Sequence, residues 1–336
     1  MKNKIKILFV TGSYPPQFCG VGDYTFKLLS CLNKKEEFSF DLFYKSEWSL
    51  KYFLKYFKEL LFKKADFYHF QYPTEGYGYS LLPLLLIFLL PRKNTVITIH
   101  ELSSRNLLAY VYTLLLVFFS KTVIVSNELE KKHASRFLFN SNKIKVIPIA
   151  SNINASDFSK NKFVDREIDL AYFGHIRPLK GIEDFIETVS FLPKNREVAL
   201  IGQSLKNYEL FFDEIKEKSE KLKIKVIANK EANEVADILS NVKIVYLPFP
   251  DGVSNRRGTL LASIQNGCLV VSTESEYGKF NIFFGEYCYL VKSNTEAVLI
   301  IEKLLNGTYV VKDTDKIKDI FSWDNVTNEH VNIYNS

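Results

Sequence analysis

The chain has 336 residues, which is enough for two domains of ordinary size, each with its own hydrophobic core. Its 47% hydrophobic and 24% charged residues are typical of a globular protein and exclude an intrinsically disordered one. The net charge of +6 is unevenly spread: residues 1–155 hold 21 basic and 11 acidic residues, whereas residues 156–336 hold 23 and 27. The basic first half indicates an anionic partner, either nucleic acid or membrane.

No targeting or spanning segment is predicted. The start of the chain resembles a signal peptide, but its apolar run is short and is interrupted by Lys6, so a first buried strand is favoured. The longest apolar stretches, residues 81–90 and 107–119, fall short of the ~20 residues that a spanning helix needs. The four cysteines show no metal-ligand spacing and are expected to be reduced thiols. We therefore predict a cytoplasmic protein, either free or attached peripherally to the inner face of the cytoplasmic membrane.

Short β-like runs alternate with helical patterns along the chain. In the first half, strands are expected at residues 4–11, 38–44, 67–71, 95–100, 121–126 and 145–147. In the second half, they are expected at residues 168–173, 197–202, 224–228, 244–247, 269–272 and 287–291. Helices such as 181–191 and 205–222 separate them. This alternation predicts an α/β protein with two Rossmann-like, doubly wound domains, each built on a parallel sheet.

The polar stretch 150–167 is the predicted linker, which gives domains at residues 1–155 and 156–320. A helix is expected over residues 321–336, with no strand after it; packing against the first domain is one option for it. Two such domains predict a cleft lined by the loops at the carboxyl ends of both sheets, where ligands of open α/β sheets bind.

A glycine-containing loop follows the first strand. Gly20 and Gly22 allow close approach of a ligand to the start of a helix predicted from about Tyr24. Thr25 stands where a dinucleotide fingerprint requires a third glycine, and the loop is long and proline-rich, which disfavours a Rossmann dehydrogenase.

Two further strand ends of the first half carry candidate residues. His100 ends the strand at 95–100, a position that favours a ligand contact over a purely structural role. The loop at residues 69–79 is rich in aromatic residues and glycine; it is either an acceptor-binding loop or a plain packed loop.

Residues 45–64 are predicted to form a basic amphipathic helix. Lys51, Lys55 and Lys58 share one face, whereas Phe53, Phe57, Leu60 and Leu61 lie largely on another. The helix is either an element of a membrane interface or a core-facing helix with a solvated lysine face. Nucleic acid is disfavoured because no recognition motif is present.

In the second half, two turns place cations beside a helix start. Arg177 and Lys180 precede the helix that begins at Gly181, and Arg256 and Arg257 precede Gly258. Cations beside a helix N-terminus suit a diphosphate leaving group. The competing interpretation is a pair of surface turns with solvated side chains. It is disfavoured because the same arrangement of cations before a helix start occurs twice.

These motifs together resemble the GT-B glycosyltransferases, and in particular glycosyltransferase family 4, over nearly the whole chain. The resemblance rests on the first strand with its glycine loop, His100, the segment from Gly174 to Gly181, and the unit from residue 247 to 273 that contains Gly267. It implies two domains facing each other across a cleft, a nucleotide-sugar bound mainly by the second domain, an acceptor bound mainly by the first, and retention of anomeric configuration without an obligatory metal or other cofactor.

Two departures from the family pattern concern the donor. His175 stands where the family usually has an arginine, and Arg177 follows two residues later, while Lys180 matches in place. The family's two glutamates, which contact the donor sugar and the ribose, align with Ser254 and Ala262. Asp251 is a candidate replacement for the sugar contact.

The resemblance assigns catalytic roles to His100, Arg177 and Lys180. The predicted donor-binding residues are Gly20, Gly22, Asp251, Ser254, Arg256, Arg257, Gly258 and Thr259.

The predicted activity is transfer of a hexosyl group from a nucleotide-sugar to a glycan, in particular a lipid-linked oligosaccharide of a surface polysaccharide such as lipopolysaccharide or capsule. The alternatives are a non-catalytic subunit of the same fold that binds a nucleotide or a partner, and a nucleotide-sugar epimerase.

Overall fold

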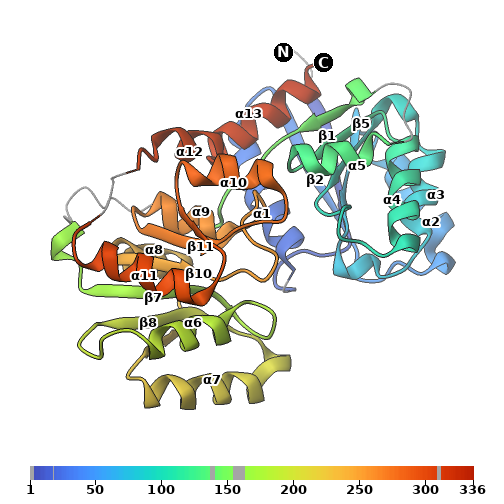
Figure 1. Ribbon diagram of the computed structural model, residues 1–336. Helices are drawn as coiled ribbons and strands as arrows, with labels where there is room; N and C mark the ends of the chain where they lie inside the picture. Colours follow the sequence, from blue (N-terminus) through green and yellow to red (C-terminus); the bar gives the residue numbers. More distant parts are fainter. Residues whose placement is uncertain (1–3, 18, 137–140, 154–162, 309–311) are drawn as a thin grey trace. The chain divides into compact units, whose positions relative to one another are not determined.

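The structure is a computed structural model that describes residues 4–17, 19–136, 141–153, 163–308 and 312–336. The chain divides into two compact units, Met1–Ile149 with Ser322–Ser336, and Ala150–Phe321 (Figure 1). The predicted boundary between residues 155 and 156 lies outside the described residues, as does the middle of the predicted linker.

The first unit is built on a parallel sheet of six strands in the order β2-β1-β3-β4-β5-β6. Its strands are β1 (Ile5–Thr11), β2 (Phe38–Tyr44), β3 (Phe67–Tyr72), β4 (Thr95–Ile99), β5 (Thr122–Val125) and β6 (Ile144–Val146). The chain moves to one side after β1 and to the other side after β2, so the strand order reverses between β1 and β3.

Helices cover both faces of this sheet. They are α1 (Gly20–Leu32), α2 (Phe53–Phe62), α3 (Leu82–Leu89), α4 (Leu107–Phe119), α5 (Glu128–Ala134) and the last helix, α13 (Trp323–Tyr334). Right-handed crossovers put α2 to α5 on one face and α1 on the other, and α13 packs beside α1. Buried side chains of α2, α3 and α4, such as Leu60, Leu86 and Leu116, form one core cluster with the sheet.

Two predicted helix limits in this unit are wrong. The first helix begins at Gly20 instead of Tyr24, because the Asp23 N–H already donates to the Cys19 carbonyl at 2.9 Å. The helix predicted over residues 45–64 is confined to a 3-10 turn, Leu50–Tyr52, and α2. The segment before it is held in a turn by side chains, since the Trp48 Nε1 donates to the Lys45 carbonyl at 2.8 Å.

The second unit has a parallel sheet in the order β12-β11-β10-β7-β8-β9, the strand order of a Rossmann fold. Its strands are β7 (Ile168–Ile176), β8 (Val198–Ser204), β9 (Lys225–Ala228), β10 (Val242–Leu247), β11 (Leu269–Thr273) and β12 (Tyr289–Val291). The order reverses between β7 and β10. All twelve predicted strands are therefore present, with ends within three residues of the prediction.

Two core clusters sandwich this second sheet. Helices α6 (Ile182–Ser190), α7 (Glu209–Lys221) and α11 (Asn294–Leu305) pack on one face, through residues that include Phe185 and Ile301. Helices α8 (Ala232–Ser240), α9 (Gly258–Gln265), α10 (Gly278–Gly285) and α12 (Asp315–Ile320) pack on the other, through residues that include Leu260 and Phe284. None of the described helices in either unit is both long and apolar enough to cross a membrane.

Candidate functional site

The switch point of the second sheet brings two loops together. The loops that follow β7 and β10 leave the carboxyl edge of neighbouring strands and run into α6 and α9, on opposite faces. This is the position at which open α/β sheets bind ligands. Six of the predicted donor-site positions lie on the second loop or at the start of α9, and Arg177 and Lys180 lie on the first.

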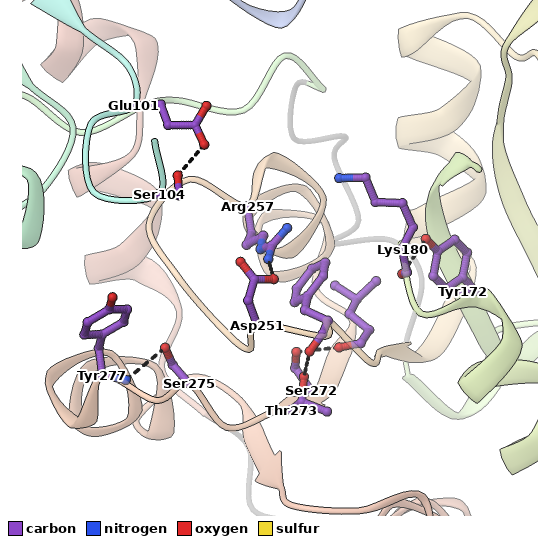
Figure 2. A network of polar contacts seen from close by, with 12 residues as sticks. Glu101, Ser104, Tyr172, Lys180, Asp251, Arg257, Ser272, Thr273, Ser275 and Tyr277 are labelled. Carbon is purple, nitrogen blue, oxygen red and sulfur yellow. Dashed lines mark hydrogen bonds and ion pairs between the residues drawn. The ribbon is translucent and has the colours of Figure 1, made fainter. Parts of the chain in front are cut away.

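The loop after β7 is fixed by a buried tyrosine and a glycine. The Tyr172 hydroxyl donates to the Lys180 carbonyl at 3.1 Å (Figure 2). Gly181 caps α6 with a φ of +79°, in the left-handed region that favours glycine. A Cβ atom there would lie 1.8 Å from the Pro248 carbonyl oxygen, so only glycine lets the two loops touch.

The loop after β10 is anchored on the neighbouring strand β11. The Ser272 hydroxyl donates to the Leu247 carbonyl at 2.6 Å, and the Thr273 hydroxyl donates to the Phe249 carbonyl (Figure 2). The Val253 N–H donates to the Thr273 carbonyl at 3.1 Å. The loop therefore has a defined backbone in which Arg257 takes the N-cap position of α9.

Arg257 is mostly buried and makes two contacts within the loop. Its guanidinium lies 4.4 Å over the Phe249 ring, and it is ion-paired with the exposed Asp251. Burial lowers the pKa of Arg257, and its Nε has no hydrogen-bond partner among the described residues. Asp251, predicted as a sugar ligand, is therefore engaged as the counterion of Arg257.

Lys180 is a half-buried cation that has no acidic partner in the described part of the chain. Burial, together with the nearby charges of Arg177 and Arg257, lowers the pKa of Lys180 to about 8. Neither Lys180 nor Arg177 forms an ion pair with a residue that the structure describes. In Figure 2 the Lys180 side chain extends toward the side on which Arg257 lies. The charges of Arg177 and Arg257 thus act on Lys180 across the two loops, and this repulsion favours an anion beside it.

The remaining predicted donor residues surround the start of α9. Ser254 is buried, and its carbonyl accepts from the Arg257 N–H at 3.1 Å. Arg256 is half-buried, Gly258 is the exposed first residue of α9, and Thr259 follows it. Ala262, which aligns with the ribose-binding glutamate, has no exposed surface and belongs to the core cluster.

His100 lies directly after β4 in the first unit and is buried. Its N–H donates to the Tyr72 carbonyl at 2.8 Å, and its Nε2 lies 2.9 Å from the Gln71 Oε1. Tyr24, on α1, packs edge-on against the imidazole with ring centroids 4.9 Å apart. Burial, with a contribution from His330, lowers the pKa of His100 to about 3, so the ring is neutral at physiological pH. The His100 side chain is therefore an uncharged hydrogen-bonding group directly after β4.

The glycine loop of the first unit also sits at a switch point. The loops after β1 and β3 are in direct contact, because a Cβ atom at Gly76 would lie 1.6 Å from the Gly12 carbonyl oxygen. The Gly76 N–H donates to the Ser13 hydroxyl at 3.1 Å. Gly22 is packed closely against Ser13, and the position of Gly20 is open.

Three supporting residues were not predicted from the sequence. Tyr172 holds the loop of Lys180, and Gln71 holds His100. The fully buried Glu130 accepts hydrogen bonds from the Leu102 N–H, the Ser103 N–H and the Ser103 hydroxyl, at 2.7 to 3.0 Å. Gln71 is a polar residue within a largely aromatic strand, whereas Tyr172 in an apolar strand and Glu130 in a charged helix give no signal in the sequence. Among the described residues, no three acidic, histidine or cysteine side chains are grouped so as to hold a metal ion.

No family model matches the chain, and no curated protein matches it in sequence. HepE of Anabaena, solved in complex with UDP and glucose, is similar with a TM-score of 0.70 and 13% identity, over 98% of this chain and 99% of that chain. The lipopolysaccharide outer core galactosyltransferase WaaB gives 0.62 and 12%, over 97% and 99%. The UDP-GlcNAc 2-epimerase of Methanocaldococcus jannaschii gives 0.64 and 15%, over 98% and 100%.

At these identities the similarity shows the fold. The two parallel six-stranded sheets with their interleaved helices match the GT-B architecture of the glycosyltransferases over nearly the full length of both chains. The predicted α/β fold of two doubly wound Rossmann-like units is thereby confirmed.

Proposed function

We propose that the chain is a retaining glycosyltransferase that moves a hexosyl group from a nucleoside-diphosphate sugar to a glycan acceptor. The observation that carries this proposal is the convergence of Arg177, Lys180 and Arg257 at the switch point of the second sheet, with the pKa of Lys180 lowered to about 8. A diphosphate is the substrate group whose charge balances these cations.

In the proposed reaction, the bond between the anomeric carbon and the diphosphate breaks while the acceptor oxygen bonds to the same face of that carbon. The acceptor proton passes to the departing diphosphate oxygen, so no separate protein base is required. Charge grows on the diphosphate during this step, and the three cations stabilise that charge. A pre-oriented group of this kind commonly contributes ~3–4 kcal/mol to lowering the barrier.

The first unit supplies groups for the transferred sugar and the acceptor. The neutral His100 imidazole orients a sugar hydroxyl, and the first turn of α1, with Gly20 and Gly22, offers backbone N–H groups. No metal or other cofactor has a role in this proposal. HepE was solved with UDP and glucose, and WaaB is described as a galactosyltransferase of the lipopolysaccharide outer core, which supports a nucleotide-sugar donor and a lipid-linked glycan acceptor.

The test is a panel of nucleotide-sugars offered to the purified protein, with and without membrane extract as acceptor source. We expect one donor to be consumed only when acceptor is present, with the anomeric configuration retained by NMR. Lys180→Ala is expected to lower turnover by ~10²–10³-fold. The control Lys216→Ala changes an exposed lysine of α7 and leaves turnover unchanged. Absence of binding and turnover with every donor would refute the proposal, and donor binding without turnover would favour the non-catalytic subunit.

An epimerase is the second candidate, because the M. jannaschii epimerase has the same fold over its whole length. An epimerase needs no acceptor, so incubation of UDP-GlcNAc with the protein alone separates the two. A second hexosamine isomer in the NMR spectrum would favour the epimerase, and an unchanged donor would favour the transferase.

A further inference from the structure

Large apolar side chains are exposed along three neighbouring helices of the first unit. Of the 23 large hydrophobic residues that are exposed in the described part of the chain, 14 lie between residues 50 and 118. On and beside α2, α3 and α4 they are Leu50, Leu54, Leu61, Phe62, Leu81, Leu85, Phe88, Leu89, Leu107, Leu108, Val111, Leu115 and Phe118. We call this set the apolar surface.

The exposed residues form one side of each helix. On α4, the spacing of Leu108, Val111, Leu115 and Phe118 follows the helical repeat, while Leu116 on the opposite side is fully buried. On α3, too, the exposed side chains lie on one side of the helix. Neither α3 nor α4 contains a charged residue. Both helices are therefore apolar on the solvent side as well as on the core side.

The apolar surface is continuous across α3 and α4. The Tyr112 hydroxyl donates to the Ser80 carbonyl at 3.0 Å, and the Phe88 and Phe119 rings meet edge to face at 5.0 Å. These contacts join the start of α3 to the middle of α4, and the ends of both helices to each other, on the same face of the sheet. In Figure 1, α2 and α3 lie beside α4 in this unit, and α2 also contacts α3.

Basic residues border this surface. Lys51 is exposed on the 3-10 turn before α2, and Lys55 and Lys58 are exposed on α2 between Leu54 and Leu61. Lys51 is paired with Glu47, whereas Lys55 and Lys58 form no ion pair with a described residue. After α3, the Arg92 guanidinium lies 5.8 Å over the Phe118 ring, and the exposed Lys93 follows it. Leu61, predicted to lie largely on another face than the lysines, is exposed.

We infer that the apolar surface docks the first unit onto an anionic lipid bilayer. Its leucine and phenylalanine side chains enter the boundary of the acyl chains, and the lysines meet the headgroup phosphates. A soluble monomer rarely exposes so large an apolar patch without a partner. A second copy of the chain fits less well, because a two-fold interface would bring the same basic margins together. The inference does not depend on the proposed transferase activity.

The test is co-sedimentation with vesicles of phosphatidylcholine alone or mixed with phosphatidylglycerol. We expect binding to the mixed vesicles that weakens as salt is raised. The double variant Leu107→Glu/Leu108→Glu is expected to bind at least about tenfold more weakly, since two apolar side chains no longer enter the bilayer. Leu210→Glu is the matched control, because Leu210 is 88% exposed on α7 and Leu108 is 84% exposed on α4.

A second variant, Lys55→Glu/Lys58→Glu, tests the charge. It is expected to lose binding to the mixed vesicles by about tenfold or more at low salt. The inference is overturned if the wild type does not bind mixed vesicles at low salt, if the Leu107/Leu108 variant binds as the wild type does, or if the wild type is a dimer that this variant dissociates. Thermal unfolding and UDP titration of each variant show whether the fold and the donor site are intact, which separates this result from a failure of the transferase proposal.

Discussion

The Nδ1 of His69 and the hydroxyl oxygen of Tyr334, which are 265 positions apart in the sequence, lie 2.6 Å from each other in the interior of the first unit. The Gln71 amide donates to the Nε2 of His69 at 3.2 Å, so the His69 proton is on Nδ1 and is donated to Tyr334. Gln71 in turn accepts from His100. A chain of hydrogen bonds therefore joins the last helix to the candidate residue at the end of β4.

Tyr334→Phe is expected to destabilise the protein, because it leaves the His69 N–H buried without an acceptor. The expected loss in the free energy of unfolding is about 1–3 kcal/mol, measured by urea denaturation. Tyr79→Phe is the control, since the Tyr79 ring is 95% exposed, and it should change nothing. Equal stability of the two variants would mean that the hydrogen bond is unimportant.

Acid is expected to destabilise the first unit through three buried histidines. Burial lowers the pKa of His100 to about 3 and that of His330 to about 4, and it lowers the pKa of His69 well below its usual value. Below pH ~6.5 the unfolded chain takes up protons that the folded chain does not, so stability present above that pH is lost as the pH falls. The slope approaches about 1.4 kcal/mol per pH unit for each histidine.

His330→Leu isolates one of these histidines. The Nε2 of His330 is buried without a hydrogen-bond partner among the described residues, so leucine is expected to be tolerated at neutral pH. Urea midpoints between pH 7.5 and 5 should then show a smaller slope than in the wild type. An unchanged slope would show that His330 does not bind a proton on unfolding.

Donor binding is expected to weaken above pH 8 if Lys180 must be charged. The pKa of Lys180 in the free protein is lowered to about 8, so each further pH unit reduces the charged fraction up to tenfold. UDP affinity measured by calorimetry from pH 7 to 9.5 should show this decrease. The Lys180→Arg variant keeps its charge over that range and should bind UDP with little dependence on pH. If the UDP affinity of both proteins decreased in parallel, the pH dependence would belong to another group.

Gly181→Ala is expected to force apart the two loops of the second switch point. The new Cβ atom would overlap the Pro248 carbonyl oxygen, and the φ of +79° is unfavourable for alanine. We expect a melting temperature lowered by several degrees and weaker UDP binding. The control is Gly285→Ala at the end of α10, where an added Cβ meets no atom within 4 Å. Unfolding by calorimetry compares the two, and equal melting temperatures would contradict the close contact.

The sequence predicts the sheets better than the helix limits. Near-continuous apolar runs such as residues 5–11 mark buried parallel strands, and the glycines and polar turns after them mark their carboxyl ends. The turns that contain Lys180 and Arg257 could thus be predicted from the sequence to lie at the carboxyl ends of strands. The start of α1 at Gly20 could not, because it depends on a backbone hydrogen bond to Cys19.

Features that depend on distant partners could not be predicted. His69 reads as an ordinary strand residue, and its contact with Tyr334 exists only because α13 packs beside α1. Which side of α4 is exposed could not be predicted either, because a helix without charged residues gives no sign of the side that faces water. The pairing of Asp251 with Arg257 depends on the shape of a single loop.

Because Gly181 and Pro248 are in contact, the anion site of the second unit depends on the packing of both core layers. Lys180 precedes a helix whose core lies on one side of the sheet, whereas Arg257 precedes a helix whose core lies on the other. A substitution that weakens the packing on either side of the sheet would therefore move Lys180 relative to Arg257. Substitutions in two cores that share no side chain would therefore produce the same defect in anion binding, and random mutagenesis selected for that defect should return changes from both sides of the sheet.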